Sequence, residues 1–251
     1  METSSPDDPG LKPSSRERLA ATKKELWGLL CWRPCLLPTW RGWVVFGLGL
    51  LLFLVVVVRS LHPFLAINNP IPDGLLVVEG WMPDYGLTSV VEEFKRNHYD
   101  KVYVTGGPLE YAMYLTPFKT YAHLGAATLV KLGLDSNVVQ VVPAPKVRQD
   151  RTYTAAVALR NWLLEHHITP TRIHLISEGP HTRRSRLLYE MAMGKGVVVG
   201  VTSVSCNDYD QQHWWRYSSG VRNVIGEGLA YLYARFLFFP PAEPKIVPTP
   251  P

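Results

Sequence analysis

The sequence has 251 residues, of which 47% are apolar, and its formal net charge is +5. This length suits one core domain with accessory segments, and the apolar fraction is enough for a sizeable core. The basic residues are spread along the chain without interleaved aromatics, so we expect no nucleic-acid partner. Cys31, Cys35 and Cys206 form neither a disulfide framework nor a zinc-ligand pattern, and we predict no metal site.

Residues 1–41 form a cytoplasmic N-terminal segment in our interpretation, with disorder predicted to about Arg18 from its proline, serine and charge. Residues 43–58 read WVVFGLGLLLFLVVVV and carry no charge. A core strand is shorter than this and a soluble helix shows a polar face, so we predict a transmembrane helix over 42–60. A cleaved signal peptide is the rival interpretation, but its charged region would extend to residue 41, which favours an uncleaved anchor.

The distribution of Lys and Arg predicts the orientation of this helix. Before it stand Lys12, Arg16, Arg18, Lys23, Lys24, Arg33 and Arg41, whereas Arg59 is followed by no basic residue until Lys95. The positive-inside rule therefore predicts a single-pass protein of the cell (inner) membrane. Its N-terminus is expected in the cytoplasm, and its main domain is expected outside the cytoplasm.

Residues 70–205 show strands and helices in regular alternation. Strands are expected near residues 75–79, 101–105, 138–142, 172–177 and 197–201, and helices near 87–98, 118–132, 152–165 and 182–192. This alternation predicts an α/β fold, a Rossmann-like three-layer sandwich with a mostly parallel sheet. The order of the strands stays open at this stage.

Residues 206–251 are expected to form a polar and aromatic loop, a final helix near 221–239 and an extended proline-rich tail. An apolar stripe of the helix comprises Val221, Val224, Ile225, Leu229, Leu232 and Phe236. Packing of this stripe on the sheet edge is favoured over contact with a membrane surface.

The segments that follow the predicted strands carry the candidate site residues. In an open parallel sheet, ligands bind outside the carboxyl ends of the strands. The candidates in chain order are Glu79, Asp84, Gly106, Gly107, Arg148, Thr152, His181 and Arg184. We expect them to converge on one pocket at that edge.

These residue types favour an anion site. The Gly106-Gly107 backbone and the forked donors of Arg148 and Arg184 suit phosphate or carboxylate. His181 is a candidate for proton transfer, with Glu79 or Asp84 as its partner. Simpler interpretations remain open, since a Gly-Gly pair is often a tight turn and a histidine at a helix start can be a cap.

The order of three short motifs resembles the YdcF/SanA/ElyC family of bacterial envelope proteins. These motifs are TGG at residues 105–107, RTY at 151–153 and H-x-x-R at 181–184. The resemblance covers residues 75–201 and implies a Rossmann-like domain that acts in cell-envelope biogenesis. It implies a ligand-binding role for Thr152 beside the glycine pair, His181 and Arg184. The chain departs from the family pattern at Tyr121, Thr154 and Ala155, where members often carry Glu or Asn.

The leading hypothesis is a membrane-anchored protein that binds an anionic envelope precursor, either lipid-linked or phosphorylated. If it is catalytic, phosphoester hydrolysis or group transfer is expected. The alternatives are a non-catalytic envelope scaffold or regulatory protein, and a nucleotide-type binder such as one for S-adenosylmethionine. The lack of a glycine-rich first loop counts against the last alternative. The sequence does not indicate a particular cofactor.

Overall fold

A computed structural model describes residues 38–71, 73–111 and 115–241. Its helices are α2 (Trp40–Leu65), α3 (Asp84–Arg96), α4 (Tyr121–Lys131), α5 (Arg151–Glu165), α6 (His181–Met193) and α7 (Ser218–Phe236). Its strands are β1 (Leu75–Glu79), β2 (Val102–Gly106), β3 (Val139–Pro143), β4 (Arg172–Glu178) and β5 (Val198–Val204). Two short 3-10 helices, η2 (Ser136–Val138) and η3 (Gln211–Arg216), complete the described elements.

The five strands form one sheet in the order β3-β2-β1-β4-β5, and every neighbouring pair is parallel. The α/β prediction is therefore confirmed. The chain first builds β1, β2 and β3 outward in one direction and then crosses back, through α5, to place β4 on the other side of β1. The carboxyl ends of β1 and β4 consequently flank the topological switch point, where open α/β sheets bind ligands.

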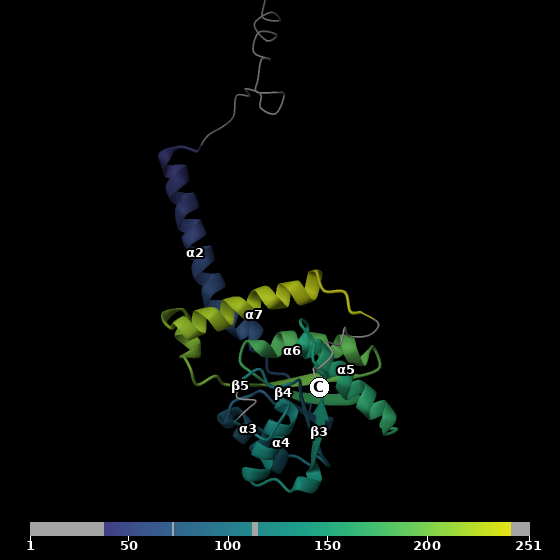
Figure 1. Ribbon diagram of the computed structural model, residues 1–251. Coiled ribbons are helices and arrows are strands. Elements are labelled where there is room, and N and C mark those ends of the chain that lie inside the picture. Colours follow the sequence, from purple (N-terminus) through teal and green to yellow (C-terminus); the bar gives the residue numbers. More distant parts are fainter. Residues whose placement is uncertain (1–37, 72, 112–114, 242–251) are drawn as a thin grey trace, which may run out of the picture. The chain divides into compact units, whose positions relative to one another are not determined.

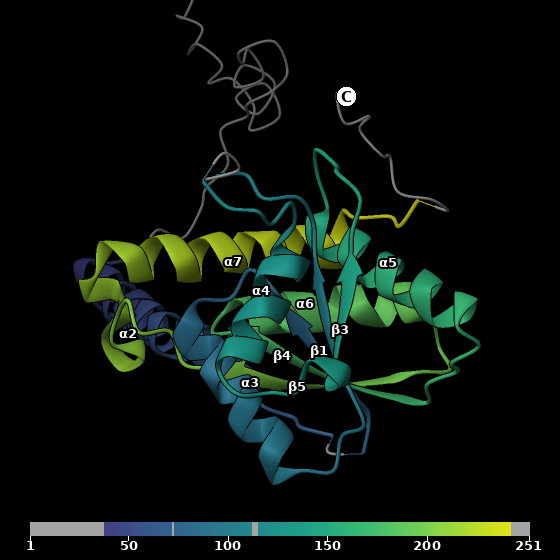
Figure 2. The same ribbon diagram turned by 60° about the horizontal axis from the view of Figure 1, so that its bottom comes forward.

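Helices cover both faces of the sheet (Figure 1, Figure 2). On one face, Val77 of β1 packs in a core with Leu159 of α5 and Leu188 of α6. On the other face, Leu76 and Val78 pack with residues of α3 and α4. Burial on both faces explains why β1 reads as a continuous apolar run rather than an alternation of apolar and polar residues.

The contact between the β1 loop and α4 depends on two glycines. A Cβ atom at Gly125 would lie 2.7 Å from the Cα of Gly80, and one at Gly80 would lie 2.4 Å from the carbonyl oxygen of Tyr121. Because Cβ atoms do not approach backbone this closely, only glycine at both positions lets α4 approach the end of β1. This approach fixes the course of the chain just beyond Glu79.

Helix α2 is long and apolar enough to cross a membrane, as predicted. It continues beyond the predicted end at residue 60, and Leu65 is buried with Trp214 and Val224. The indole Nε1 of Trp214 donates a hydrogen bond of 3.1 Å to the carbonyl oxygen of Val58. The described residues from Phe53 to 241, including this last part of α2, belong to one compact unit.

Helix α7 runs alongside α6, on the side of α6 away from the sheet (Figure 1, Figure 2). Its small residues Gly220, Val224 and Ala234 are buried. By contrast, Leu229 and Phe236 are 65% and 68% exposed, so the prediction that their stripe packs on the sheet edge is wrong. The disorder predicted for the N-terminus and the extended tail lie outside the described residues, apart from the tail's first residues up to 241.

Candidate functional site

The candidate site lies at the switch point between β1 and β4. Glu79 is the last residue of β1, and His181 is the first residue of α6, directly after β4. Gly179 stands between β4 and α6 with a φ of +45°, a left-handed conformation that glycine adopts without strain. This turn brings His181 to the carboxyl edge of the sheet. No side-chain cap is present at the start of α6, so His181 does not act as the helix cap.

Glu79 is buried, with 3% of its surface exposed, and its carboxylate accepts hydrogen bonds from two serines. Ser177 of β4 donates to Oε2, and the Oγ of Ser185 in α6 lies 3.1 Å from both carboxylate oxygens. The imidazole Nε2 of His181 lies 3.5 Å from Oε1. A carboxylate buried in this way is held in one orientation by its donors.

His181 lies between two carboxylates. Its Nδ1 donates a hydrogen bond of 2.9 Å to Oε1 of Glu227, and its Nε2 faces Glu79. The ring edge packs on Trp81, with ring centroids 4.9 Å apart. Among the described residues, Nε2 has no hydrogen-bond partner, because 3.5 Å to Glu79 is too long for one. Among the described residues this nitrogen is therefore a buried polar atom without a hydrogen-bond partner, and its nearest acceptor is the Glu79 carboxylate.

Arg184, one turn along α6, shares Glu227 with the histidine. Its Nε donates to Oε2 of Glu227 at 2.8 Å and its Nη2 donates to Oε1 at 3.1 Å. The same Nη2 lies 2.9 Å from Nδ1 of His181. Both nitrogens carry protons when the imidazole is charged, so they do not bond to each other and instead both donate to Oε1 of Glu227. Its Nη1 lies 3.5 Å from the hydroxyl oxygen of Thr152, a weak contact.

The charges of this cluster determine the protonation state of the histidine. Burial alone would lower the pKa of His181, but the negative charges of Glu79 and Glu227 outweigh it and raise the pKa to about 9. Burial would raise the pKa of both carboxyls, and the charge of His181 overrides it, so both pKa values are lowered. At neutral pH the cluster thus holds two anions and two cations, with His181 as an imidazolium.

The structure brings together Glu79, Thr152, His181 and Arg184 from the predicted set. Asp84, the first residue of α3, and Arg148 are exposed, and no hydrogen bond or ion pair among the described residues joins either to this cluster. Of the two possible partners of His181, the geometry therefore selects Glu79.

The predicted glycine pair has a different explanation at its first position. A Cβ at Gly106 would lie 2.8 Å from the Cβ of Tyr121 and 2.9 Å from the backbone nitrogen of Ala122. Glycine is required there by the packing of α4 against β2. At Gly107 an added Cβ would meet only the carbonyl oxygen of Pro145, at 4.0 Å.

Sequence reasoning missed Glu227, which binds both cations of the cluster. It also missed Ser177 and Ser185, which donate hydrogen bonds to Glu79. A signal for Glu227 was present, since it is the one acidic residue in the sequence of α7. Ser185 stands one helical turn after His181, so its position on the same face of α6 could have been predicted.

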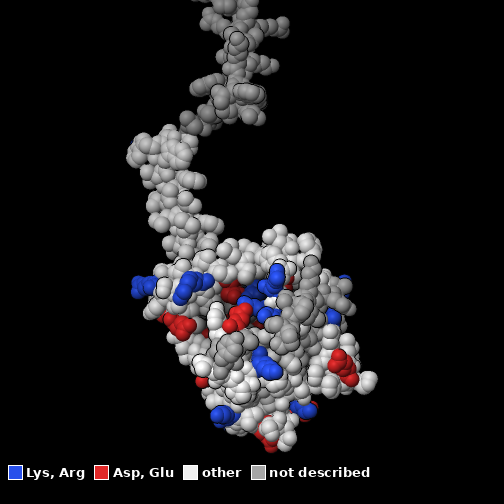
Figure 3. All heavy atoms as spheres, viewed as in Figure 1, with Lys and Arg blue, Asp and Glu red and all other residues white. Residues whose placement is uncertain are grey.

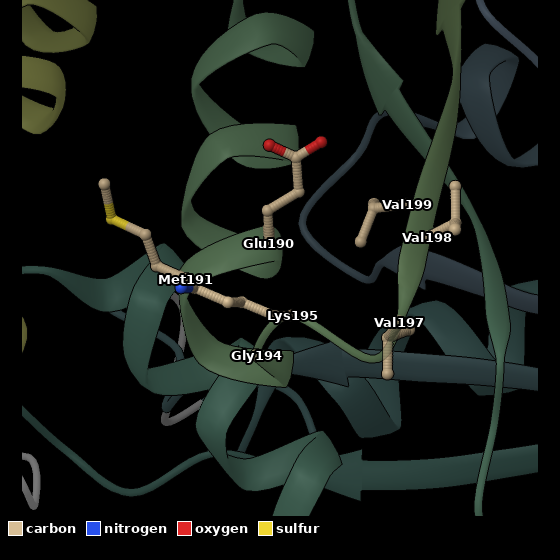
Figure 4. A pocket seen from close by; sticks show the side chains of 7 residues that line it. All are labelled: Glu190, Met191, Gly194, Lys195, Val197, Val198 and Val199. Carbon is tan, nitrogen blue, oxygen red and sulfur yellow. The ribbon is translucent and has the colours of Figure 1, made fainter.

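The face of the molecule seen in Figure 3 carries both signs of charge. In Figure 3, positive and negative side chains lie side by side on the visible face and form no extended one-signed field. A separate hollow of about 470 Å³ lies at the end of α6 and the start of β5, at the opposite edge of the sheet. Figure 4 shows Glu190, Lys195 and three valines around it. None of the candidate residues lines this hollow.

Comparison with known proteins adds no identity: no family model matches the chain, and neither a curated protein nor a solved structure matches it significantly. The interpretation of the fold and of the cluster at its switch point therefore rests on the structure alone. What they define is an α/β protein with a buried, charge-balanced histidine site and a helix long enough to anchor it in a membrane.

Proposed function

We propose that this chain is a membrane-anchored, YdcF-like protein that binds an anionic, phosphate-bearing precursor of the bacterial cell envelope. In this proposal the α/β domain lies outside the cytoplasm, beside the inner membrane from which a lipid-linked precursor is presented. The order of the TGG, RTY and H-x-x-R segments supports the family assignment. The bias of Lys and Arg around α2 supports the orientation.

The observation that carries the proposal is the imidazolium of His181 between Glu79 and Glu227 at the switch point. A pKa raised to about 9 makes the ring a proton donor at neutral pH. Its Nε2 is buried and has no hydrogen-bond partner among the described residues, so a ligand oxygen would accept from it once the side chains around the ring move. Glu79 and Glu227 act as positioning residues, because they hold the ring and its charge.

Arg184 supplies the second contact for an anion. Two of its nitrogens are committed to Glu227, whereas Nη1 has only the 3.5 Å contact with Thr152. A phosphate oxygen near Thr152 would gain a charge-assisted hydrogen bond from this nitrogen. Trp81, 37% exposed and in contact with His181, borders the same place and offers apolar surface to the rest of a ligand.

If the site is catalytic, we propose phosphoester hydrolysis or group transfer with His181 as the general acid. In hydrolysis, a water oxygen forms a bond to phosphorus while the bond from phosphorus to the leaving oxygen breaks. The proton on Nε2 of His181 passes to that leaving oxygen, and the proton released by the attacking water restores the imidazolium. Arg184 would stabilise the charge that develops on the phosphoryl oxygens.

The test uses the full chain in lipid nanodiscs with farnesyl phosphate and undecaprenyl phosphate, two phosphomonoesters, as probes. We expect both to raise the thermal midpoint and, for an enzyme, to release phosphate. His181→Gln keeps a polar side chain at the buried position, so it should preserve the fold while phosphate release falls at least 100-fold. Glu190→Gln, in a partly exposed pair on the same helix, is the matched control. Absence of any shift with both probes would refute the proposal.

Binding without turnover is the second candidate, and one observation favours it. Each carboxylate of the cluster already has a cationic partner, as in a site built for structure or regulation. In that case the probes still raise the thermal midpoint of the wild type, but no phosphate is released. A folded His181→Ala variant would then lose the rise in thermal midpoint that the probes cause in the wild type, and phosphate release would be absent from both proteins.

A further inference from the structure

The outer face of α7 is an uncovered apolar stripe. Its members are Val221, Ile225, Leu229, Leu232 and Phe236, all exposed. They recur at intervals of three and four residues, the spacing that places side chains on one face of a helix. Leu229 and Phe236 are 65% and 68% exposed, respectively. Contiguous exposed apolar surface of this kind marks an interaction site, whereas scattered apolar residues do not.

We propose that this stripe lies in the headgroup region of the lipid bilayer, so that α7 is an interfacial helix parallel to the membrane plane. Its opposite face is committed to the protein: Val224 and Ala234 are buried, and Glu227 is bound in the His181 cluster. The helix therefore has one side for the domain and one side for another apolar medium. The inference concerns a surface and does not depend on what the site binds.

The exposed charges of α7 suit an anionic lipid surface. Arg222 and Arg235 are exposed, while the acidic residue of the helix, Glu227, faces inward and is paired. Interfacial helices combine an apolar face with basic residues that reach the lipid phosphates. The exposed arginines and the apolar stripe of α7 therefore both favour contact with an anionic lipid surface.

Contacts with the end of α2 hold α7 close to the level at which α2 would leave the membrane. The rings of Phe64 in α2 and Tyr231 in α7 pack edge to face with centroids 5.7 Å apart. The guanidinium of Arg183 lies 4.0 Å from the centroid of Phe64 and 5.9 Å from that of Tyr231. Leu61 and Leu65 border Gly228, since a Cβ there would lie 3.8 Å from a methyl group of each. The middle of α7 therefore packs on the last turn of the membrane-length helix.

Arg59 marks where α2 leaves the hydrocarbon, because it is the first charge after the apolar run. Its guanidinium lies 5.2 Å from the ring centroid of Trp215, an aromatic type typical of the membrane interface. From Arg59 to Phe64 the helix rises by about 8 Å. The interfacial layer is roughly 5–8 Å thick on each side of the hydrocarbon, so the part of α2 that contacts α7 ends within or just beyond this layer.

The experiment measures membrane depth with nitroxide labels on the full chain in vesicles that contain phosphatidylglycerol. Leu229→Cys and Leu164→Cys are made in a background with Cys31, Cys35 and Cys206 replaced by alanine. Leu164 on α5 is a matched control, because it is 63% exposed and Leu229 is 65% exposed. The accessibility of each label to oxygen and to a water-soluble nickel complex is compared by electron paramagnetic resonance. Phe236→Cys provides a second position on the stripe.

We expect the labels at Leu229 and Phe236 to favour oxygen at least several-fold over nickel, while the label at Leu164 favours nickel. Equal, water-like accessibility at all three positions would overturn the proposal. Dipolar broadening at Leu229 that disappears when labelled protein is diluted with unlabelled protein would also overturn it, because it would show a second copy covering the stripe. Circular dichroism checks that each variant keeps its helical content.

Discussion

Replacing Glu227 with glutamine removes one anion from the buried cluster and leaves His181 and Arg184 beside each other. The rise of the His181 pKa from 6.5 to about 9 corresponds to about 3 kcal/mol in favour of the protonated ring in the folded state. Of the two carboxylates beside His181, Glu227 is the one that accepts a hydrogen bond from the ring, and it also accepts one from Arg184. We therefore expect Glu227→Gln to lower the free energy of unfolding by about 2–4 kcal/mol at pH 6.5, near the range for breaking a buried ion pair.

The pH dependence of stability provides a second readout. In the unfolded chain His181 loses its proton near pH 6.5, whereas in the folded protein it keeps the proton up to about pH 9. The unfolded state thus binds fewer protons in this window, so the contribution of His181 is full below pH 6.5 and is lost as the pH rises through 9. In Glu227→Gln the folded pKa lies closer to 6.5, and this loss should be smaller.

The assay is urea unfolding of the full chain in detergent micelles, followed by tryptophan fluorescence at pH 6.5 and pH 9.5. Glu190→Gln is the control, because Glu190 forms an i,i+4 pair with Arg186 at the surface and should cost less than about 0.5 kcal/mol. If Glu227→Gln proves as stable as the wild type and the two proteins lose equal stability between these pH values, the inferred charge coupling is wrong.

Three further changes probe the frame around the site. Gly80→Ala should lower the thermal midpoint by several degrees, because its Cβ would lie 2.4 Å from the carbonyl oxygen of Tyr121; differential scanning calorimetry measures this. Tyr189→Phe removes a buried hydroxyl 2.8 Å from the Oγ1 of Thr105 and should cost about 1 kcal/mol in urea unfolding. Ser177→Ala removes a donor to Glu79 that lowers the pKa of this carboxyl, so the pKa should rise and stability should begin to fall at a higher pH on acidification than in the wild type.

Much of the fold was predictable because strands alternate with helices, and burial on both faces gives β1 a continuous apolar run. The expected strand at 172–177 is observed as Arg172–Glu178, and the one at 75–79 as Leu75–Glu79. Helix starts were less predictable. The apolar periodicity of α3 begins at Leu87, but the helix itself begins at Asp84, because Asp84, Tyr85 and Gly86 add no aliphatic side chain to the periodic pattern.

The outward direction of the α7 stripe could not be predicted from periodicity. A repeat of apolar residues shows that a face exists but not which medium it meets. Here the face that packs on the protein carries small side chains, Gly220 and Ala234, which allow close approach, while the large side chains point away. The usual inference that the larger apolar face is the buried one failed for this reason.

The candidate site was predictable in part. The rule that ligands bind at the carboxyl ends of parallel strands identified Glu79 and His181, which come from the two strands that flank the switch point. It could not identify Glu227, because α7 lies outside the alternating pattern and reaches the site by packing on α6. It included Asp84 and Arg148 because proximity to a strand end does not determine the direction of a side chain.

Helix α7 holds Glu227 and Leu229 on the same rigid rod, with one side chain in the charged cluster and the other turned outward. Any displacement of this rod must therefore shift the carboxylate relative to His181 and Arg184. A force on the outer side of α7 would therefore change the distance between Glu227 and His181, and with it the pKa of the imidazole.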